Sequence, residues 1–81
     1  MKEVIEFFES IGFKVDESNT SEHHFYMYNF LNQVEQIDVQ GNENRISMRL
    51  ILRHGVQEDV TYSFDKDIIL NKISEWKEDY F

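Results

Sequence analysis

The chain has 81 residues, contains no cysteine, and carries sixteen acidic against eight basic residues, which gives a net charge of −8. This length predicts one compact domain over residues 1–81, and the absence of cysteine excludes disulfide bonds and thiol catalysis. A surface of this charge repels nucleic acid and anionic membranes and favours cationic partners. Since the chain also has no long apolar run and no recognisable signal peptide, we expect a cytoplasmic protein that binds neither nucleic acid directly nor membranes.

The first predicted element is an amphipathic helix over residues 2–11, because apolar residues recur along one face with glutamates between them. Gly12 suits the left-handed conformation that ends many helices, and Phe13 can fold back onto the last turn. A short extended segment, FKV, follows. The polar run DESNTSE then predicts a loop over residues 16–22.

The next segment, EHHFYMYNFL at residues 22–31, alternates like a strand but carries large apolar or aromatic groups on both faces. One face holds Phe25, Met27 and Leu31, and the other holds His24, Tyr26, Tyr28 and Phe30. Asn32 and Gln33 predict a tight turn into VEQIDVQ, and therefore a hairpin. A short helix over residues 30–37 with Asn29 as its N-cap is the alternative, since the apolar residues there also have helical spacing.

The segment GNEN predicts a turn, and RISMRLILR is the clearest strand pattern in the chain. Its core face is predicted to hold Ile46, Met48, Leu50 and Leu52, and its other face to hold Arg45, Ser47, Arg49 and Arg53. HGVQED is interpreted as a turn and VTYSF as a final strand with Val60, Tyr62 and Phe64 inward. A closing helix follows, with Asp65 as its N-cap and one apolar stripe of Ile69, Ile73, Trp76 and Tyr80.

These elements predict an α+β fold: an N-terminal helix, a three- to four-stranded antiparallel meander sheet and a C-terminal helix, with both helices on one sheet face. The other face of the sheet would then be open.

Catalytic and metal sites have little support in the sequence. His23 and His24 are adjacent and would point to opposite faces of a strand, so they cannot chelate one ion together. The chain has no Gly-rich phosphate loop, no nucleophile elbow and no HExxH motif. We therefore expect no enzyme activity, no metal and no cofactor.

The first candidate interaction surface is the open sheet face, where the arginine row of Arg45, Arg49 and Arg53 would lie beside Tyr26 and Tyr28. Tyrosine and arginine are the residues typical of interface hot spots, and guanidinium groups bind carboxylates and phosphates in a bidentate manner. The alternative interpretation is that these arginines only pair across strands with acids or stack on tyrosines.

The second candidate surface is acidic. Glu75, Glu78 and Asp79 crowd the end of the closing helix, where the helix dipole favours cations, so helix stability does not explain them. With Glu3, Glu6 and Glu9 on the first helix, they could compete for a basic, nucleic-acid-binding groove on another protein. The alternative is an acidic face that only keeps the protein soluble.

In size and charge, although in no alignable motif, the chain is similar to small acidic inhibitor and immunity proteins of phages and other mobile elements. That resemblance implies a non-enzymatic module that binds a basic protein through one of these two surfaces. The alternative function is a structural homodimer that associates through the open sheet face.

Overall fold

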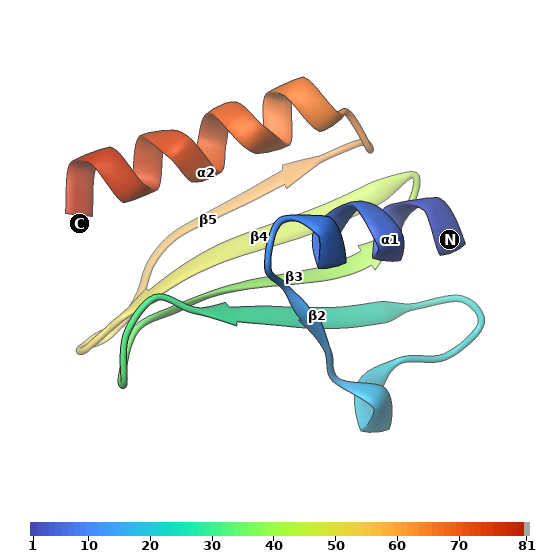
Figure 1. The fold of residues 1–81 in the computed structure, drawn as a ribbon, viewed down its shortest axis with the longest axis horizontal. Helices are drawn as coiled ribbons and strands as arrows, with labels where there is room; N and C mark the ends of the chain where they lie inside the picture. The colour runs from blue at the N-terminus through green and yellow to red at the C-terminus, as the bar shows by residue number, and fades with distance from the viewer. Residues whose placement is uncertain (81) are drawn as a thin grey trace.

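The computed structural model describes residues 1–80 and arranges them as a helix, a five-stranded sheet and a second helix (Figure 1). In chain order the elements are α1 (Lys2–Ser10), β1 (Lys14–Val15), the short 3₁₀ helix η1 (Glu17–Asn19), β2 (Phe25–Phe30), β3 (Gln36–Asn42), β4 (Arg45–Leu52), β5 (Gly55–Tyr62) and α2 (Lys66–Tyr80). All neighbouring strands are antiparallel and follow the order β1-β2-β3-β4-β5. The predicted α+β meander is therefore confirmed, with five strands instead of three to four because Lys14 and Val15 pair with β2.

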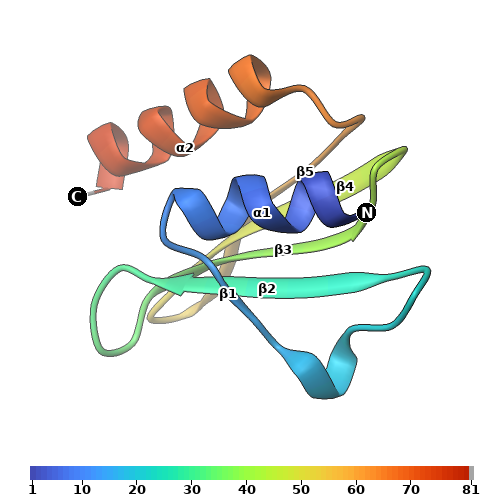
Figure 2. The same ribbon diagram turned by 45° about the vertical axis from the view of Figure 1, so that its right-hand side comes forward.

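The core lies between the helices and one face of the sheet (Figure 2). Helix α1 buries Val4 and Phe8, and helix α2 buries its stripe of Ile69, Ile73 and Trp76. The sheet contributes the alternate residues Phe25, Met27, Ile37, Val39, Ile46, Met48 and Leu50 to the same apolar cluster. The strand residues between them point away from both helices. Within residues 1–80, α1 and α2 both lie on the core face, so neither covers the opposite face of the sheet (Figure 2).

Local signals in the sequence explain where helix α1 ends and where helix α2 begins. Gly12 has a φ of 99°, and the amides of Gly12 and Phe13 donate to the carbonyls of Glu9 and Phe8, which is the Schellman arrangement. The ring of Phe13 packs edge-on against Phe8 with 5.2 Å between centroids. At α2, the Asp65 carboxylate accepts hydrogen bonds from the amides of Asp67 and Ile68, as expected of an N-cap.

The segment over residues 30–37 is a hairpin and contains no helix among the residues described. Its connection is longer than the predicted two-residue turn, because β3 begins only at Gln36. The Asn32 side chain organises the loop by accepting hydrogen bonds from the amides of Val34 and Glu35.

The last hairpin differs from the sequence prediction. HGVQED was expected to be a turn, but strand β5 begins at Gly55, so only Arg53 and His54 connect it to β4. Gly55 adopts a φ of 121°, which permits this tight connection. A register shift between Leu50 and Ile51 inserts one extra residue in β5, a β-bulge that alternation in the sequence does not reveal.

Candidate functional site

The uncovered sheet face is ordered in three rows of side chains that run across β2 to β5. Strand register places Tyr28, Asp38, Arg49 and Asp59 in the central row. The row on one side contains Phe30, Gln36, Ile51 and Val56, and the row on the other side contains Tyr26, Gln40, Ser47 and Thr61. Directly opposed residues in antiparallel strands share a face, so these twelve side chains form one surface.

Asp38 is the centre of a polar cluster on this surface. Only 2% of it is exposed, although it lies on the face that no helix covers. Its carboxylate accepts a hydrogen bond from the Tyr26 hydroxyl and another, 2.7 Å long, from the Gln36 amide. Burial, and next the hydrogen bond to Asp38, raise the pKa of the Tyr26 phenol above its ordinary value. These contacts hold Tyr26 in one position on the surface.

Arg49 lies beside this cluster without being fully satisfied by it. Its Nη2 atom is 3.9 Å from Oδ2 of Asp38, which is beyond hydrogen-bond distance. Its Nε atom is shielded from solvent and has no hydrogen-bond partner among the residues described. A buried donor without a partner raises the energy of the molecule. The Arg49 side chain as a whole is 31% exposed, and its guanidinium is not held by Asp38 at hydrogen-bond distance, so it can donate to an acidic or carbonyl partner.

The predicted arginine row is only partly present. Arg45 is exposed on the same face as Arg49, at the end of β4 that pairs with Asn42. Arg53 lies beyond the end of β4, in the connection to β5, and so does not belong to the row. The prediction failed there because the tight turn at Gly55 ends the strand at Leu52. Arg53 instead borders a shallow pocket with loop residues 32–35.

The row at one edge of the face is apolar and exposed. Phe30 is 59% exposed and Val56 is 53% exposed, and Ile51 lies between them next to Val56. Tyr28 packs edge-on against Phe30 with 5.5 Å between ring centroids. This row is the most apolar part of the uncovered face.

The acidic surface lies on the helices, on the opposite side of the sheet from Tyr26, Tyr28 and Arg49. Both helices run in the same direction, so their C-terminal ends point to the same side of the molecule (Figure 1). Glu9 on α1 and Glu78 and Asp79 on α2 are exposed at these ends and form no ion pair with any residue between 1 and 80. By contrast, Glu75 lies 3.4 Å from the Lys72 ammonium. The negative ends of both helix dipoles add to the potential of these carboxylates.

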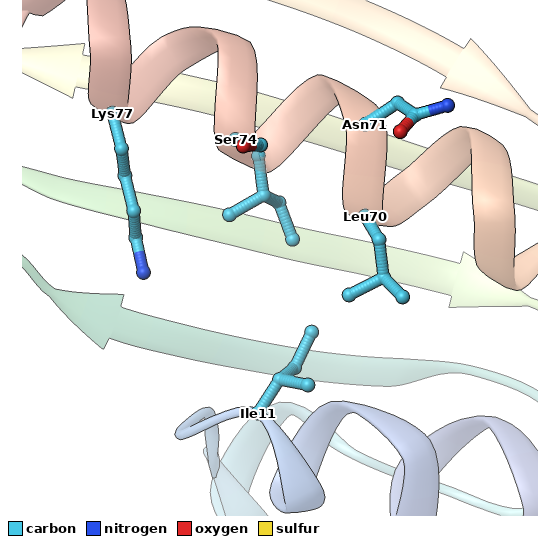
Figure 3. A pocket seen from close by; sticks show the side chains of 6 residues that line it. Ile11, Leu70, Asn71, Ser74 and Lys77 are labelled. Atoms are coloured by element: carbon cyan, nitrogen blue, oxygen red, sulfur yellow. The ribbon is translucent and has the colours of Figure 1, made fainter.

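A groove separates the two helices near these acidic ends (Figure 3). Ile11 at the end of α1 faces Leu70 of α2, and the Lys77 side chain hangs from α2 at the same opening. Ile73 forms the apolar floor, and Asn71 and Ser74 complete the lining. The groove has a volume of about 430 Å³, which is within the range that accepts one or two large side chains or a small ligand.

A second charged cluster fastens α2 to β5. The Glu58 carboxylate accepts hydrogen bonds of 2.7 Å from both the Lys72 ammonium and the Trp76 indole. The bond from Lys72, and next that from Trp76, lower the pKa of Glu58, and the same ion pair raises the pKa of Lys72. Because Trp76 is buried, this cluster has a structural role that positions the acidic end of α2.

Charge is divided unevenly between the strands and the rest of the chain. The five strands contain three acidic and three basic residues, which leaves thirteen acids and five bases on the helices and connecting segments. Seven of these acids and four of these bases lie on α1 and α2, and the other six acids and one base lie in η1 and the connecting segments. The whole net charge of −8 therefore lies outside the strands.

Comparison of the chain with protein-family models, with curated proteins and with solved structures gave no match. Neither helix within residues 1–80 has the length and apolarity needed to cross a membrane.

Sequence reasoning placed Tyr26, Tyr28, Arg45 and Arg49 on one face, and the structure brings them there together. It missed Asp38, because burial of an outward-facing acid depends on how Tyr26 and Gln36 fold over it. It also missed Val56, which the β-bulge turns onto the uncovered face. Alternation of Ile37 and Val39 with Asp38 was the one signal that an acid would lie beside Arg49.

Proposed function

We propose that this protein is a small, non-enzymatic protein-binding module of the inhibitor or immunity type, and that the outer surface of its two helices binds a basic protein. The observation that carries the proposal is the concentration of acidic charge on the helices and loops, with Glu9, Glu78 and Asp79 unpaired among the described residues at the negative ends of both helices. Such a charge distribution steers a cationic partner toward the helix side.

The groove between the helices can supply binding energy that exposed charges do not. Carboxylates on an exposed surface speed up association and favour cationic partners, but they contribute little to the binding free energy. An apolar side chain of the partner that entered the groove beside Ile11, Leu70 and Ile73 would be removed from water, which contributes roughly 1.5 to 3 kcal/mol for a residue of that size. The unpaired carboxylates at the helix ends and the apolar residues of the groove, which has Lys77 at its opening, fit a basic segment that carries one apolar anchor.

A partner of this kind would use the same basic surface to bind nucleic acid. Occupation of that surface by carboxylates would block nucleic-acid binding, which is how the module would act as an inhibitor. No catalytic step is required of the protein itself.

The experiment is affinity capture from lysate of the source cells with the immobilised protein and two double variants. Glu78→Lys with Asp79→Lys reverses the charge on the helix surface. Glu17→Lys with Glu22→Lys makes the same change in net charge in the loop before β2, and all four side chains are exposed. We expect a basic protein to be captured by the wild type and by the loop variant and lost with the helix variant. Equal capture by the two variants, or captured proteins that are not basic, would refute the proposal.

A further inference from the structure

The uncovered sheet face has the charge distribution that a contact between two copies of this chain requires. Two proteins of net charge −8 repel each other over most of their surfaces. The strands hold equal numbers of acids and bases, and Glu58 lies on the helix side, where it binds Trp76. A second copy therefore meets least repulsion on this face.

The exposed side chains at the ends of the central and apolar rows are complementary to those at the other end of the same row. A two-fold axis parallel to the strands and midway between β3 and β4 would lay β2 over β5 and β3 over β4 of a second copy. In the central row this operation sets Tyr28 over Asp59 and Arg49 over Asp38 of the second copy. In the apolar row it sets Phe30 over Val56 and Gln36 over Ile51. At the exposed ends of the two rows an acid thus faces a hydroxyl and an apolar side chain faces an apolar one, while Asp38 stays covered by Tyr26 and Gln36 of its own copy.

Several groups that lack partners in the single chain would gain them in this arrangement. The Tyr28 hydroxyl makes no hydrogen bond, and Asp59 forms no ion pair, with any described residue, although Asp59 lies directly opposite Arg49. Phe30 and Val56 each expose more than half of their surface. We propose that the uncovered sheet face binds a second copy of this chain face to face, with Tyr28 of each copy donating to Asp59 of the other and Phe30 packing on Val56.

The size of the face sets the strength of the contact. Strands β2 to β5 are six to eight residues long, so at about 4.8 Å between strands and about 3.3 Å per residue the face measures on the order of 500 Å² in each copy. About 1,000 Å² in total is near the lower limit for a specific interface. A contact of this size is expected to form a dimer that depends on protein concentration.

This contact is independent of the proposed function. It leaves both acidic helix surfaces pointing outward on opposite sides of the dimer, so each copy keeps its binding surface. Charge reversal at Glu78 and Asp79 does not change the dimer, because both residues lie on the helix side.

Solution mass, measured by light scattering or sedimentation from about 5 µM to 1 mM, tests the proposal. Phe30→Lys is compared with the matched control Ile68→Lys, which adds the same charge at an exposed apolar residue of α2. We expect the wild type and Ile68→Lys to approach twice the monomer mass, and Phe30→Lys to weaken association at least about tenfold. A wild type that stays monomeric throughout, or a dimer that Phe30→Lys leaves intact, overturns the proposal.

A second measurement locates the contact with a label at its border. Because the chain has no cysteine, Ser63→Cys, at an exposed residue just after β5 and outside the three rows, accepts a single spin label. Mixed with unlabelled, ¹⁵N-enriched protein, it is expected to broaden the amide signals at the start of β2, which lies opposite the end of β5 of the other copy in the arrangement above. Broadening confined to α1 and α2 would contradict the face-to-face contact.

Discussion

Replacement of Tyr26 by Phe tests the polar cluster around Asp38 with the removal of one oxygen atom. The Tyr26 hydroxyl donates to a carboxylate that is 2% exposed, and Gln36 supplies its other side-chain hydrogen bond. A hydrogen bond to a charged group contributes about 1.5 to 3 kcal/mol, and loss of the donor leaves a buried carboxylate less solvated. We therefore expect Tyr26→Phe to lower the free energy of unfolding by about 2 kcal/mol.

Urea unfolding of each variant at one low protein concentration, about 5 µM, measures this change, and the corresponding fall in Tm is about 8 to 16 °C for a domain of this size. Tyr28→Phe is the matched control, since Tyr28 lies on the same strand and face but its hydroxyl has no hydrogen-bond partner among the described residues. It is expected to change stability by less than about 0.5 kcal/mol. If the two variants were equally stable, Asp38 would not be held by Tyr26 and the reasoning about this surface would fail.

Three further predictions concern the fold. Gly41→Ala is expected to lower the free energy of unfolding by more than about 3 kcal/mol, and Gly55→Ala by only about 1 to 2 kcal/mol. Both glycines have a positive φ, but a Cβ at Gly41 would lie 2.0 Å from a backbone oxygen, whereas one at Gly55 would meet no atom within 4 Å. Urea unfolding of the two variants measures the difference. Asp65→Ala removes the N-cap of α2 and is expected to lower the free energy of unfolding by about 1 kcal/mol in the same assay. Unchanged stability would contradict the capping role of Asp65. The pKa of Glu58 is lowered in the folded state. The stability difference between wild type and Glu58→Gln should therefore be present at pH 7, begin to shrink as the pH falls below the ordinary carboxyl value of 4.5, and be lost once the folded carboxylate is protonated at its lower pKa. A difference that grew on acidification would refute the role of its pairing with Lys72.

Much of the fold could be predicted because local signals agree with one another. The apolar stripe of α1, the glycine that ends it and the alternation of β4 each point to the same arrangement. The start of β5 could not be predicted in this way. Gln57, Glu58 and Asp59 are three consecutive polar residues of an edge strand, and the one that faces the helices, Glu58, does so through polar contacts with Lys72 and Trp76, so no apolar alternation marks the strand there.

The site was harder to predict than the fold, because surface chemistry depends on which side chains meet across strands. The sequence placed tyrosines and arginines on one face, but only the register sets Arg49 between Asp38 and Asp59. The sequence also placed acids on both helices. It did not predict that the C-terminal ends of the helices lie on one side of the molecule with a groove between the helices. Those relations follow from tertiary packing, which no local pattern contains.

The most direct test of the proposed binding surface is the affinity of this protein for the captured basic protein, measured by calorimetry at about 0.05 M and 0.5 M salt. If the partner binds the helix surface, we expect Kd to rise at least about tenfold at high salt. At low salt the double variant Glu78→Lys with Asp79→Lys should raise Kd by a similar factor, and Phe30→Lys should leave Kd unchanged. A Kd that is independent of salt and is raised by Phe30→Lys would place the partner on the sheet face and contradict the account.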